Sequence, residues 1–277
     1  METRNYLNVG CGTKFHRAWT NIDMVSTNPA VRAVNLIQGI PFEADRFEVL
    51  YHSQVLEHIP KEKAPAFLAE CLRVLRPGGI LRVVVPDLED IATEYLRLLQ
   101  ENRAAPSARA AADYDWMLLE MYDQVVRNHS GGAMAEYLRQ PGIVNKDFVD
   151  ARIGVVARDL LSSARDAASP STLRRLATLT PAKLAGWLQR QWRQRVGGEA
   201  LRVGSFRLGG EAHLWMYDRY SLSRALHQVG FVDVQRLDPH TSAVPDWAGY
   251  QLDVRDGAVF DPTSLFMEAR KPLGGLA

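Results

Sequence analysis

Two glycines and an acid give the N-terminal part of the chain its clearest signal for chemistry. Gly10 and Gly12 follow a short apolar run, and glycines at such a turn let the backbone approach a ligand while N–H groups face an anionic group. Asp23 stands 13 residues after Gly10, at the end of the next predicted strand, where a carboxylate can accept both hydroxyls of a ribose. Each feature alone also fits an ordinary tight turn or turn cap. Together they favour a nucleoside-binding site.

The residue three positions after the second glycine argues against a dinucleotide cofactor. The dinucleotide fingerprint requires a third glycine there, and the chain has Phe15. Cys11, between the two glycines, has no cysteine or histidine partner at metal-ligand spacing. We therefore expect Cys11 to be structural rather than nucleophilic.

Alternating strands and helices are predicted to place these residues at one edge of a parallel sheet. A helix after Pro60 carries apolar side chains at helical spacing and is stopped by Pro77-Gly78-Gly79. The apolar run that follows suits a central strand covered on both faces. Strand–helix alternation implies crossover connections, and such sheets bind ligands at the carboxyl ends of their strands. The predicted strands are 5–9, 20–24, 33–36, 47–51 and 80–85.

The rest of the chain is predicted to be helical and then mixed. We predict a single domain, 1–277, in which a helical insertion or lid at 106–211 separates core strands 5 and 6. Before this insertion, Asp87 can cap a helix whose apolar stripe runs from Leu88 to Leu98. A helix from Ser221 and final strands at 231–234 and 264–269 complete the domain.

These motifs resemble those of class I S-adenosylmethionine-dependent methyltransferases of the small-molecule type. Five pieces occur in the order typical of that family: 7–12, 19–23, 39–42, 53–59 and 72–81. Three pieces of the tail resemble bacterial members associated with surface-polysaccharide and other glycan biosynthesis: 215–218, 229–231 and 264–269.

The resemblance implies an α/β fold with a Rossmann-like seven-stranded sheet, helices on both faces, and S-adenosylmethionine as the cofactor, converted to S-adenosylhomocysteine. It implies that Asp23 holds the ribose and that Met24 lies against the adenine. From the methionine end to the adenine edge, the implied cofactor contacts are Ser53, Gln54, Gly10, Cys11, Gly12, Asp23, Met24, Asn35 and Leu36.

A hydroxyl acceptor must lie in line with the methyl and the sulfur, and a base must take its proton. We rank His213 first as that base, then Asp123, then His58. Each of these residues also has a purely structural interpretation. His213 can be a hydrogen-bonded residue packed where the chain re-enters the core, and Asp123 can lie at a solvent-exposed helix end. His58 can hydrogen-bond the start of the helix after Pro60. No His or acidic cluster has metal-ligand spacing, so we expect no required metal. Candidate acceptor contacts are Asp87, Arg127, Asn128, His129, Trp215 and Tyr217.

Composition excludes several classes of protein. The chain has 33 basic and 32 acidic residues, a net charge of +1, unlike strongly basic nucleic-acid binders. Its 2 cysteines exclude a disulfide framework and a four-cysteine zinc site. Neither a membrane-spanning run nor a signal peptide is predicted, so we expect a cytoplasmic protein.

The even net charge conceals a basic segment. Residues 151–207 hold 11 basic and 3 acidic residues, a net charge of +8, whereas the rest of the chain carries −7. The predicted helix 181–196 places Trp187 and Trp192 on one apolar face flanked by arginines. Such a helix is typical of contact with the inner face of a membrane, or of a lid packed on the core.

Together these patterns predict a methyltransferase that O-methylates a hydroxyl of a sugar or glycan intermediate. The alternatives are a methyltransferase of a secondary metabolite, acting on oxygen or nitrogen, and a cofactor-binding protein without catalysis. We expect no nucleic-acid partner, because the chain has neither a base-flipping motif nor a basic reader domain. The sequence leaves open the acceptor, the base and the oligomeric state.

Overall fold

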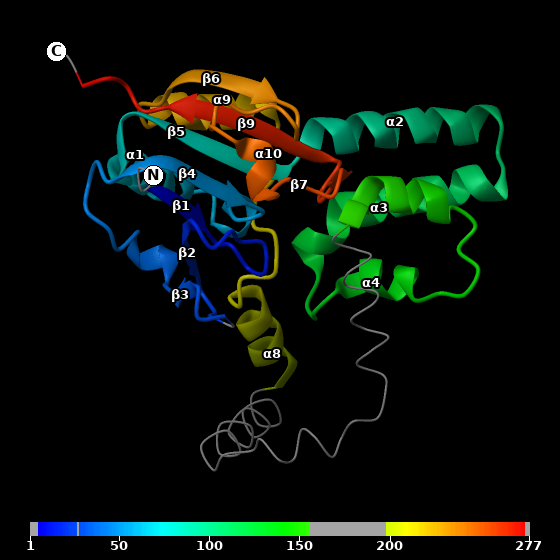
Figure 1. Ribbon diagram of the computed structural model, residues 1–277. Helices are drawn as coiled ribbons and strands as arrows, with labels where there is room; N and C mark the ends of the chain where they lie inside the picture. The colour runs from blue at the N-terminus through cyan, green and yellow to red at the C-terminus, as the bar shows by residue number, and fades with distance from the viewer. Residues whose placement is uncertain (1–4, 27, 156–197, 275–277) are drawn as a thin grey trace.

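A computed structural model of the chain describes residues 5–26, 28–155 and 198–274. Its main feature is a seven-stranded sheet of order β3-β2-β1-β4-β5-β9-β6 (Figure 1). The strands from β3 to β5 are parallel, and β9 runs antiparallel to both of its neighbours. The strands are β1 (Tyr6–Val9), β2 (Thr20–Asp23), β3 (Val31–Ala33), β4 (Phe47–Ser53), β5 (Leu75–Pro86), β6 (Val232–Leu237) and β9 (Ser264–Arg270).

This strand order, with one reversed strand next to the edge, confirms the predicted Rossmann-like sheet. β1 is buried along its whole length, and β5 is buried from Gly79 to Val85. Strands that are covered on both faces require continuous apolar runs, which explains the apolar run at residues 80–85. β3 begins two residues earlier than predicted because a turn at Asn28, which accepts from Val31 N at 2.9 Å, starts the strand there.

The segment Pro77-Gly78-Gly79 differs from its predicted role. The preceding helix α1 (Ala64–Val74) ends before the proline, and Leu75 already pairs with Phe47 in the sheet. The proline and glycines therefore lie inside β5, where the register shifts and Gly78 adopts a φ of 75°. A positive φ costs a glycine little, so the segment bends a strand instead of ending a helix.

Helices cover both faces of the sheet, as predicted. α1 and α9 (Arg219–Gln228) lie on one face, where Leu68 and Leu222 join a core with Leu81. The other face is covered by the short helix α10 (Trp247–Tyr250) and by loops, with an aromatic cluster of Trp19, Tyr51 and Trp247. A two-stranded ribbon of β7 (Val254–Arg255) and β8 (Ala258–Val259) precedes β9.

A separate helical region extends from the end of β5 (Figure 1). Its helices are α2 (Leu88–Ala104), α3 (Ala108–Val126) and α4 (Gly132–Leu138); residues 146–155 are also helical. Their own core contains Ile91, Leu98, Trp116, Met117 and Val149. The region thus begins at Leu88, before the predicted boundary at 106, because α2 packs against α3.

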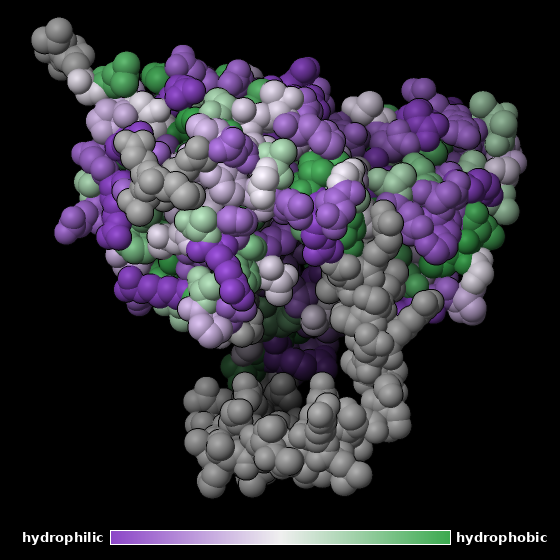
Figure 2. Space-filling view, viewed as in Figure 1, coloured by the Kyte–Doolittle hydropathy of each residue, from purple (hydrophilic) through white to green (hydrophobic). Residues whose placement is uncertain are grey.

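The chain returns to the sheet through α8 (Gly198–Arg207), whose Arg207 Nη1 donates to Val125 O at 2.9 Å. The predicted basic helix 181–196, with Leu184, Trp187, Leu188 and Trp192, lies outside the described residues. On the face in Figure 2, hydrophilic residues dominate, and apolar ones form small separate groups. Among the described helices, none is both long and apolar enough to cross a membrane.

A buried guanidinium ties the sheet to the loops on its second face. Arg82 is fully buried in β5, and its Nε donates to Asp253 Oδ2 at 2.7 Å. Its Nη1 donates to Glu268 Oε1 at 2.8 Å and to Thr241 O at 2.9 Å. Tyr51 Oη adds a 2.7 Å hydrogen bond to Asp253. One cation therefore compensates two buried carboxylates.

We expect Arg82→Met to lower the free energy of unfolding by about 3–5 kcal/mol, since Asp253 and Glu268 would remain buried without their cation. Urea unfolding measures the change. Arg97→Met is the matched control: Arg97 also pairs with two carboxylates, but its side chain is 53% exposed, so about 1 kcal/mol or less is expected. Equal losses in both variants would contradict this account.

Candidate cofactor and acceptor site

The glycine turn lies at the carboxyl end of β1 and is fastened to β2. Gly10 N donates to Ile22 O at 2.8 Å. Gly10 has a φ of 64°, and a Cβ there would lie 2.4 Å from Val55 Cγ2, so only glycine fits. A Cβ on Gly12 would meet no atom within 4 Å, and the backbone therefore borders open space at this position. These features agree with a turn that a ligand can approach closely.

No helix follows this turn, although the structure describes every residue from Gly10 to Trp19. A helix N-terminus is the usual source of positive potential for an anionic group beside such glycines. Lys14 occupies this region instead, and its Nζ lies 2.9 Å from Asp261 Oδ2 and 3.4 Å from Ser53 Oγ. Sequence reasoning gave Lys14 no role, although it stands only two residues after Gly12.

Asp23 ends β2 with its carboxylate held beside the glycine turn. Oδ2 accepts from Gly12 N at 2.8 Å, and Oδ1 accepts from Val25 N at 3.0 Å. Two backbone bonds orient the carboxylate, and each oxygen retains a lone pair for a hydroxyl. Met24, implied for the adenine, is 50% exposed next to it. The position of Asp23 is thus compatible with its predicted role at the ribose.

The remaining implied cofactor contacts lie at neighbouring strand ends. Asn35 is exposed, and Leu36 opens the short helix η1 (Leu36–Gln38) after β3. Ser53 is the last residue of β4. Gln54 has a φ of 56°, and its Nε2 donates to Ser264 Oγ at 2.9 Å. A non-glycine residue in this conformation carries strain, which is common at functional sites.

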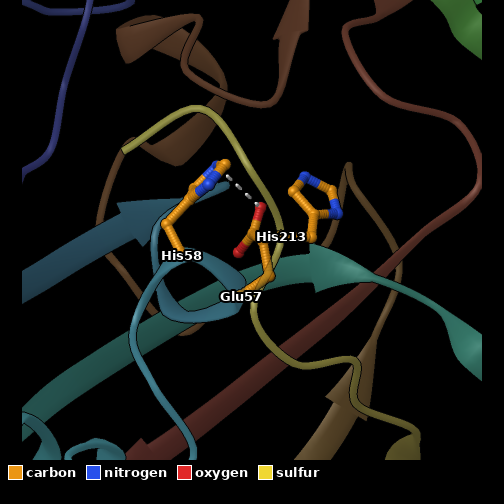
Figure 3. Close-up of side chains that lie close together, drawn as sticks. All are labelled: Glu57, His58 and His213. Atoms are coloured by element: carbon orange, nitrogen blue, oxygen red, sulfur yellow. Dashed lines mark ion pairs between the residues drawn. The ribbon is translucent and has the colours of Figure 1, made fainter. Parts of the chain in front are cut away.

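Beyond β4, an acid and two histidines converge (Figure 3). Glu57 and His58 belong to the short helix η2 (Leu56–His58), and His213 belongs to the segment that returns from the helical region. His58 Nε2 lies 3.8 Å from Glu57 Oε1, and the two imidazole rings are 4.8 Å apart between centroids. Backbone hydrogen bonds hold the segments together: Leu214 N donates to Glu57 O at 2.7 Å, and His213 N donates to Gln124 O at 2.9 Å.

Burial determines the charge states in this cluster. Glu57 is fully buried, neither carboxylate oxygen has a hydrogen-bond partner among the described residues, and burial raises the pKa of Glu57 to about 8. Burial lowers the pKa of His58 and, with smaller effects of His58 and Arg127, lowers that of His213 to about 3. Both imidazoles are therefore neutral at neutral pH. The sequence led us to His58 and His213 but gave Glu57 no role.

Asp123, the second predicted base, is engaged in local structure. Its Oδ2 lies 2.5 Å from Arg127 Nη2, and its Oδ1 accepts from Ala133 N at 2.7 Å. Arg127 Nη1 also reaches Glu211 Oε1 at 3.3 Å. These bonds join the end of α3 to α4 and to the returning segment. The role of Asp123 as a base stays a prediction.

Of the predicted acceptor contacts near Asp123, Arg127 has a side chain only 8% exposed, whereas Asn128 and His129 lie on the surface. Asn128 Oδ1 is 2.9 Å from His129 Nδ1. The His129 side chain is 57% exposed, and its Nε2 lies 3.4 Å from Glu136 Oε1. These two residues are available to solvent, and their contact with an acceptor stays a prediction.

Three further predicted contacts have different surroundings. Asp87 caps α2 by accepting from Glu89 N at 3.0 Å, and burial raises its pKa. Tyr217 is buried in the core, which raises its pKa to about 12. Trp215 is 38% exposed, and Lys61 Nζ lies 3.9 Å from the centroid of its ring. Of the three, Trp215 is the one with a ring accessible to a ligand.

Residues 7–83 match the sequence model of a protein family described as "Methyltransferase domain". This part of the chain, just over a quarter of its length, is similar to methyltransferase domains. The match agrees with the predicted enzyme class for the part that holds Gly10, Asp23 and Ser53. No curated protein sequence matches the chain significantly.

Solved methyltransferases resemble the chain at low identity. The 1,6-didemethyltoxoflavin-N1-methyltransferase of Burkholderia thailandensis is 23% identical, over 30% of this chain and 46% of its own, with a TM-score of 0.26. A methyltransferase in complex with the Trm112 activator of Haloferax volcanii is 8% identical, over 98% and 84%, with a TM-score of 0.39. A methyltransferase from Archaeoglobus fulgidus is 10% identical, over 97% and 86%, with a TM-score of 0.38.

The chain covers less than half the length of the first of these structures. At such TM-scores the likenesses carry no argument about acceptor or partner.

We expect Asp23→Asn to weaken S-adenosylmethionine binding roughly 10- to 100-fold, because hydrogen bonds to a charged acceptor contribute about 1.5–3 kcal/mol. Isothermal titration calorimetry measures the affinity. Asp233→Asn, on the edge strand β6, removes an exposed carboxylate away from the glycine turn and serves as the control. Unchanged affinity in Asp23→Asn would contradict a ribose contact.

We expect both cysteines of the native protein to resist thiol reagents at pH 8. Burial raises the pKa of Cys11 to about 12 and raises that of Cys71 further, so the thiolate fraction is very small. A chromogenic disulfide reagent counts reactive thiols, and both should react after unfolding in urea. Rapid reaction of either thiol in the native state would contradict this expectation.

Proposed function

We propose that the chain is an S-adenosylmethionine-dependent methyltransferase that methylates a hydroxyl of a small-molecule acceptor, namely a sugar or glycan intermediate. One observation carries this proposal. The glycine turn and Asp23 lie at the carboxyl ends of β1 and β2, and the cluster of Glu57, His58 and His213 lies beyond the end of the adjacent strand β4. A cofactor-binding part and a polar group with titratable atoms thus occupy one edge of the sheet.

The residues at this edge fit the cofactor. Open space borders Gly12, and Asp23 presents an oriented carboxylate beside it. Ser53 and Gln54 would contact the methionine end, and Met24 and Leu36 would contact the adenine. When bound, the cofactor supplies a methyl group activated by its sulfonium. The protein must then orient the acceptor, exclude water and receive a proton.

We assign proton removal from the acceptor to the cluster of Glu57, His58 and His213. The His58 side chain remains 24% exposed, so an acceptor can approach the cluster from solvent. Nδ1 of His58 lies 3.1 Å from Ala212 O and donates to it, which leaves the lone pair of Nε2 directed at Glu57. His213 alone is a weak base because burial lowers its pKa to about 3. The cluster therefore acts as a unit.

A sugar acceptor is favoured by the aromatic surface beside this cluster. Trp215 N donates to Glu57 O at 3.2 Å, so the backbone of this 38% exposed residue is bonded to the loop that carries Glu57 and His58. Aromatic rings pack on the apolar faces of sugars, and Lys61 next to the ring can meet an anionic group such as a phosphate.

The decisive experiment compares ligands and acceptors on the purified full chain. Calorimetry should show binding of S-adenosylmethionine and none of NAD. Labelled methyl groups should pass to sugar nucleotides or lipid-linked sugars and not to phenols or amines. Transfer to phenols or amines would indicate a secondary-metabolite enzyme, and cofactor binding without transfer to any of these acceptors would contradict the proposal.

We expect Trp215→Ala to raise the KM for a sugar acceptor roughly 10-fold, the loss expected from about 1.4 kcal/mol of ring contact, with S-adenosylmethionine affinity unchanged. Steady-state kinetics separate the two effects. Tyr220→Ala is the control, because Tyr220 is a 69% exposed aromatic residue on α9. An equal effect of both substitutions on KM would contradict the contact.

We also propose that the basic segment attaches the protein peripherally to the inner face of the membrane. Its support is the +8 charge of residues 151–207 and the tryptophans of 181–196 in the sequence. The protein should float with anionic vesicles at low salt and be released at high salt, where screening weakens the attraction. Absence of flotation at low salt would refute this contact.

A further inference from the structure

Glu57 presents an electrostatic problem that the described protein atoms do not solve. Its carboxylate is fully buried, and neither oxygen accepts a hydrogen bond. Burying an unpaired carboxylate costs several kcal/mol, so such a group is expected to bind a proton or a cation. The two imidazoles beside it supply nitrogen atoms, which suits a metal ion better than a bare proton.

The geometry around Glu57 supports a metal. One ligand atom each from Glu57, His58 and His213 can be chosen so that all lie within 4.8 Å of one another. Nδ1 of His58 donates to Ala212 O, so the lone pair of Nε2 lies 3.8 Å from a carboxylate oxygen. Metal-binding histidines characteristically donate their second nitrogen to a backbone carbonyl in this way.

We propose that Glu57, His58 and His213 bind a divalent first-row transition metal ion, with Zn²⁺ as its representative. Two histidines and one glutamate form a ligand set of catalytic zinc sites, which keep a fourth position open. Calcium and magnesium prefer oxygen ligands, and two imidazoles disfavour them. This proposal replaces the expectation from sequence that no metal is required.

The positively charged side chains around the cluster are each paired with carboxylates, so they do not strongly repel a bound cation. Lys14 lies on the β1 side and is paired with Asp261 at 2.9 Å. Arg127 faces the histidines from α3, and Asp123 and Glu211 compensate it. The three ligands contribute one negative charge from Glu57, and the 24% exposed side chain of His58 gives an ion access from solvent.

Metal binding stands independently of the proposed function, but the role of the metal rests on it. An acceptor hydroxyl at the open position would lose its proton more readily, because a bound divalent ion lowers the pKa of a coordinated oxygen. The cluster would then activate the hydroxyl through the metal rather than through one histidine acting alone.

The test uses the full chain, stripped with a chelator and titrated with Zn²⁺ in the presence of a competing chelator. We expect one tightly bound Zn²⁺ per chain and a rise in the melting temperature, since an ion that binds only the folded state stabilises it. Glu57→Gln and His213→Asn should each weaken binding roughly 100-fold and remove the melting shift. His227→Asn changes an exposed histidine of α9 and should leave binding as in the wild type.

Circular dichroism establishes that each variant is folded, and having two ligand variants keeps the test informative if one does not fold. Wild-type affinity in the folded ligand variants, or the absence of stoichiometric binding to the wild type, would overturn the metal site and assign Glu57 a proton instead. Metal binding without methyl transfer would support the site while the proposed function fails. Methyl transfer by a chain that binds no zinc would refute the metal alone.

Discussion

The hydrogen bond from Leu214 N to Glu57 O, 2.7 Å long, joins the two parts of this molecule. It attaches the segment returning from the helical region to the loop that follows β4. Together with the bonds from His213 N to Gln124 O and from His58 Nδ1 to Ala212 O, it holds His213 beside Glu57 and His58. The second bond to the same carbonyl, from Trp215 N, attaches the backbone of the next residue to the same loop. The candidate acceptor side of the site therefore depends on main-chain atoms, which every residue except proline would supply at position 214.

A second constraint, the buried ion pairs of Arg82, holds the loops on one face of the sheet against its strands. Arg82 projects from the central strand β5 and compensates Glu268 on β9 and Asp253 in the loop before β7. Buried ion pairs contribute little net stability compared with apolar packing, but they penalise arrangements that separate the charges. The guanidinium therefore favours the observed pairing of the reversed strand β9 with β5. Asp261 lies in the same stretch between Asp253 and β9 and reaches Lys14, so this network also bears on the cofactor side of the site.

The cofactor side departs from the usual construction of a glycine turn. Here the chain passes from β1 to β2 without a helix, so no helix dipole faces the ligand. Local positive charge comes from Lys14, and orientation comes from the bonds of Asp23 to backbone N–H groups. The site is thus built from loops fastened to strand ends.

Local properties of the sequence were enough to predict the positions of the strands, the glycine turn and the placement of Asp23 at the end of a strand. Burial on both faces demands continuous apolar runs, and a turn with a φ of 64° favours glycine at position 10. The strand boundaries were less certain, as β3 and the bend at Gly78 show, since pairing partners decide them. Only the tertiary structure placed His213 against Glu57 and His58 and Lys14 against Asp261. These groups are distant in sequence, and local sequence patterns cannot predict which loops the folded sheet brings together. The unpaired state of the Glu57 carboxylate likewise depends on burial by the whole fold.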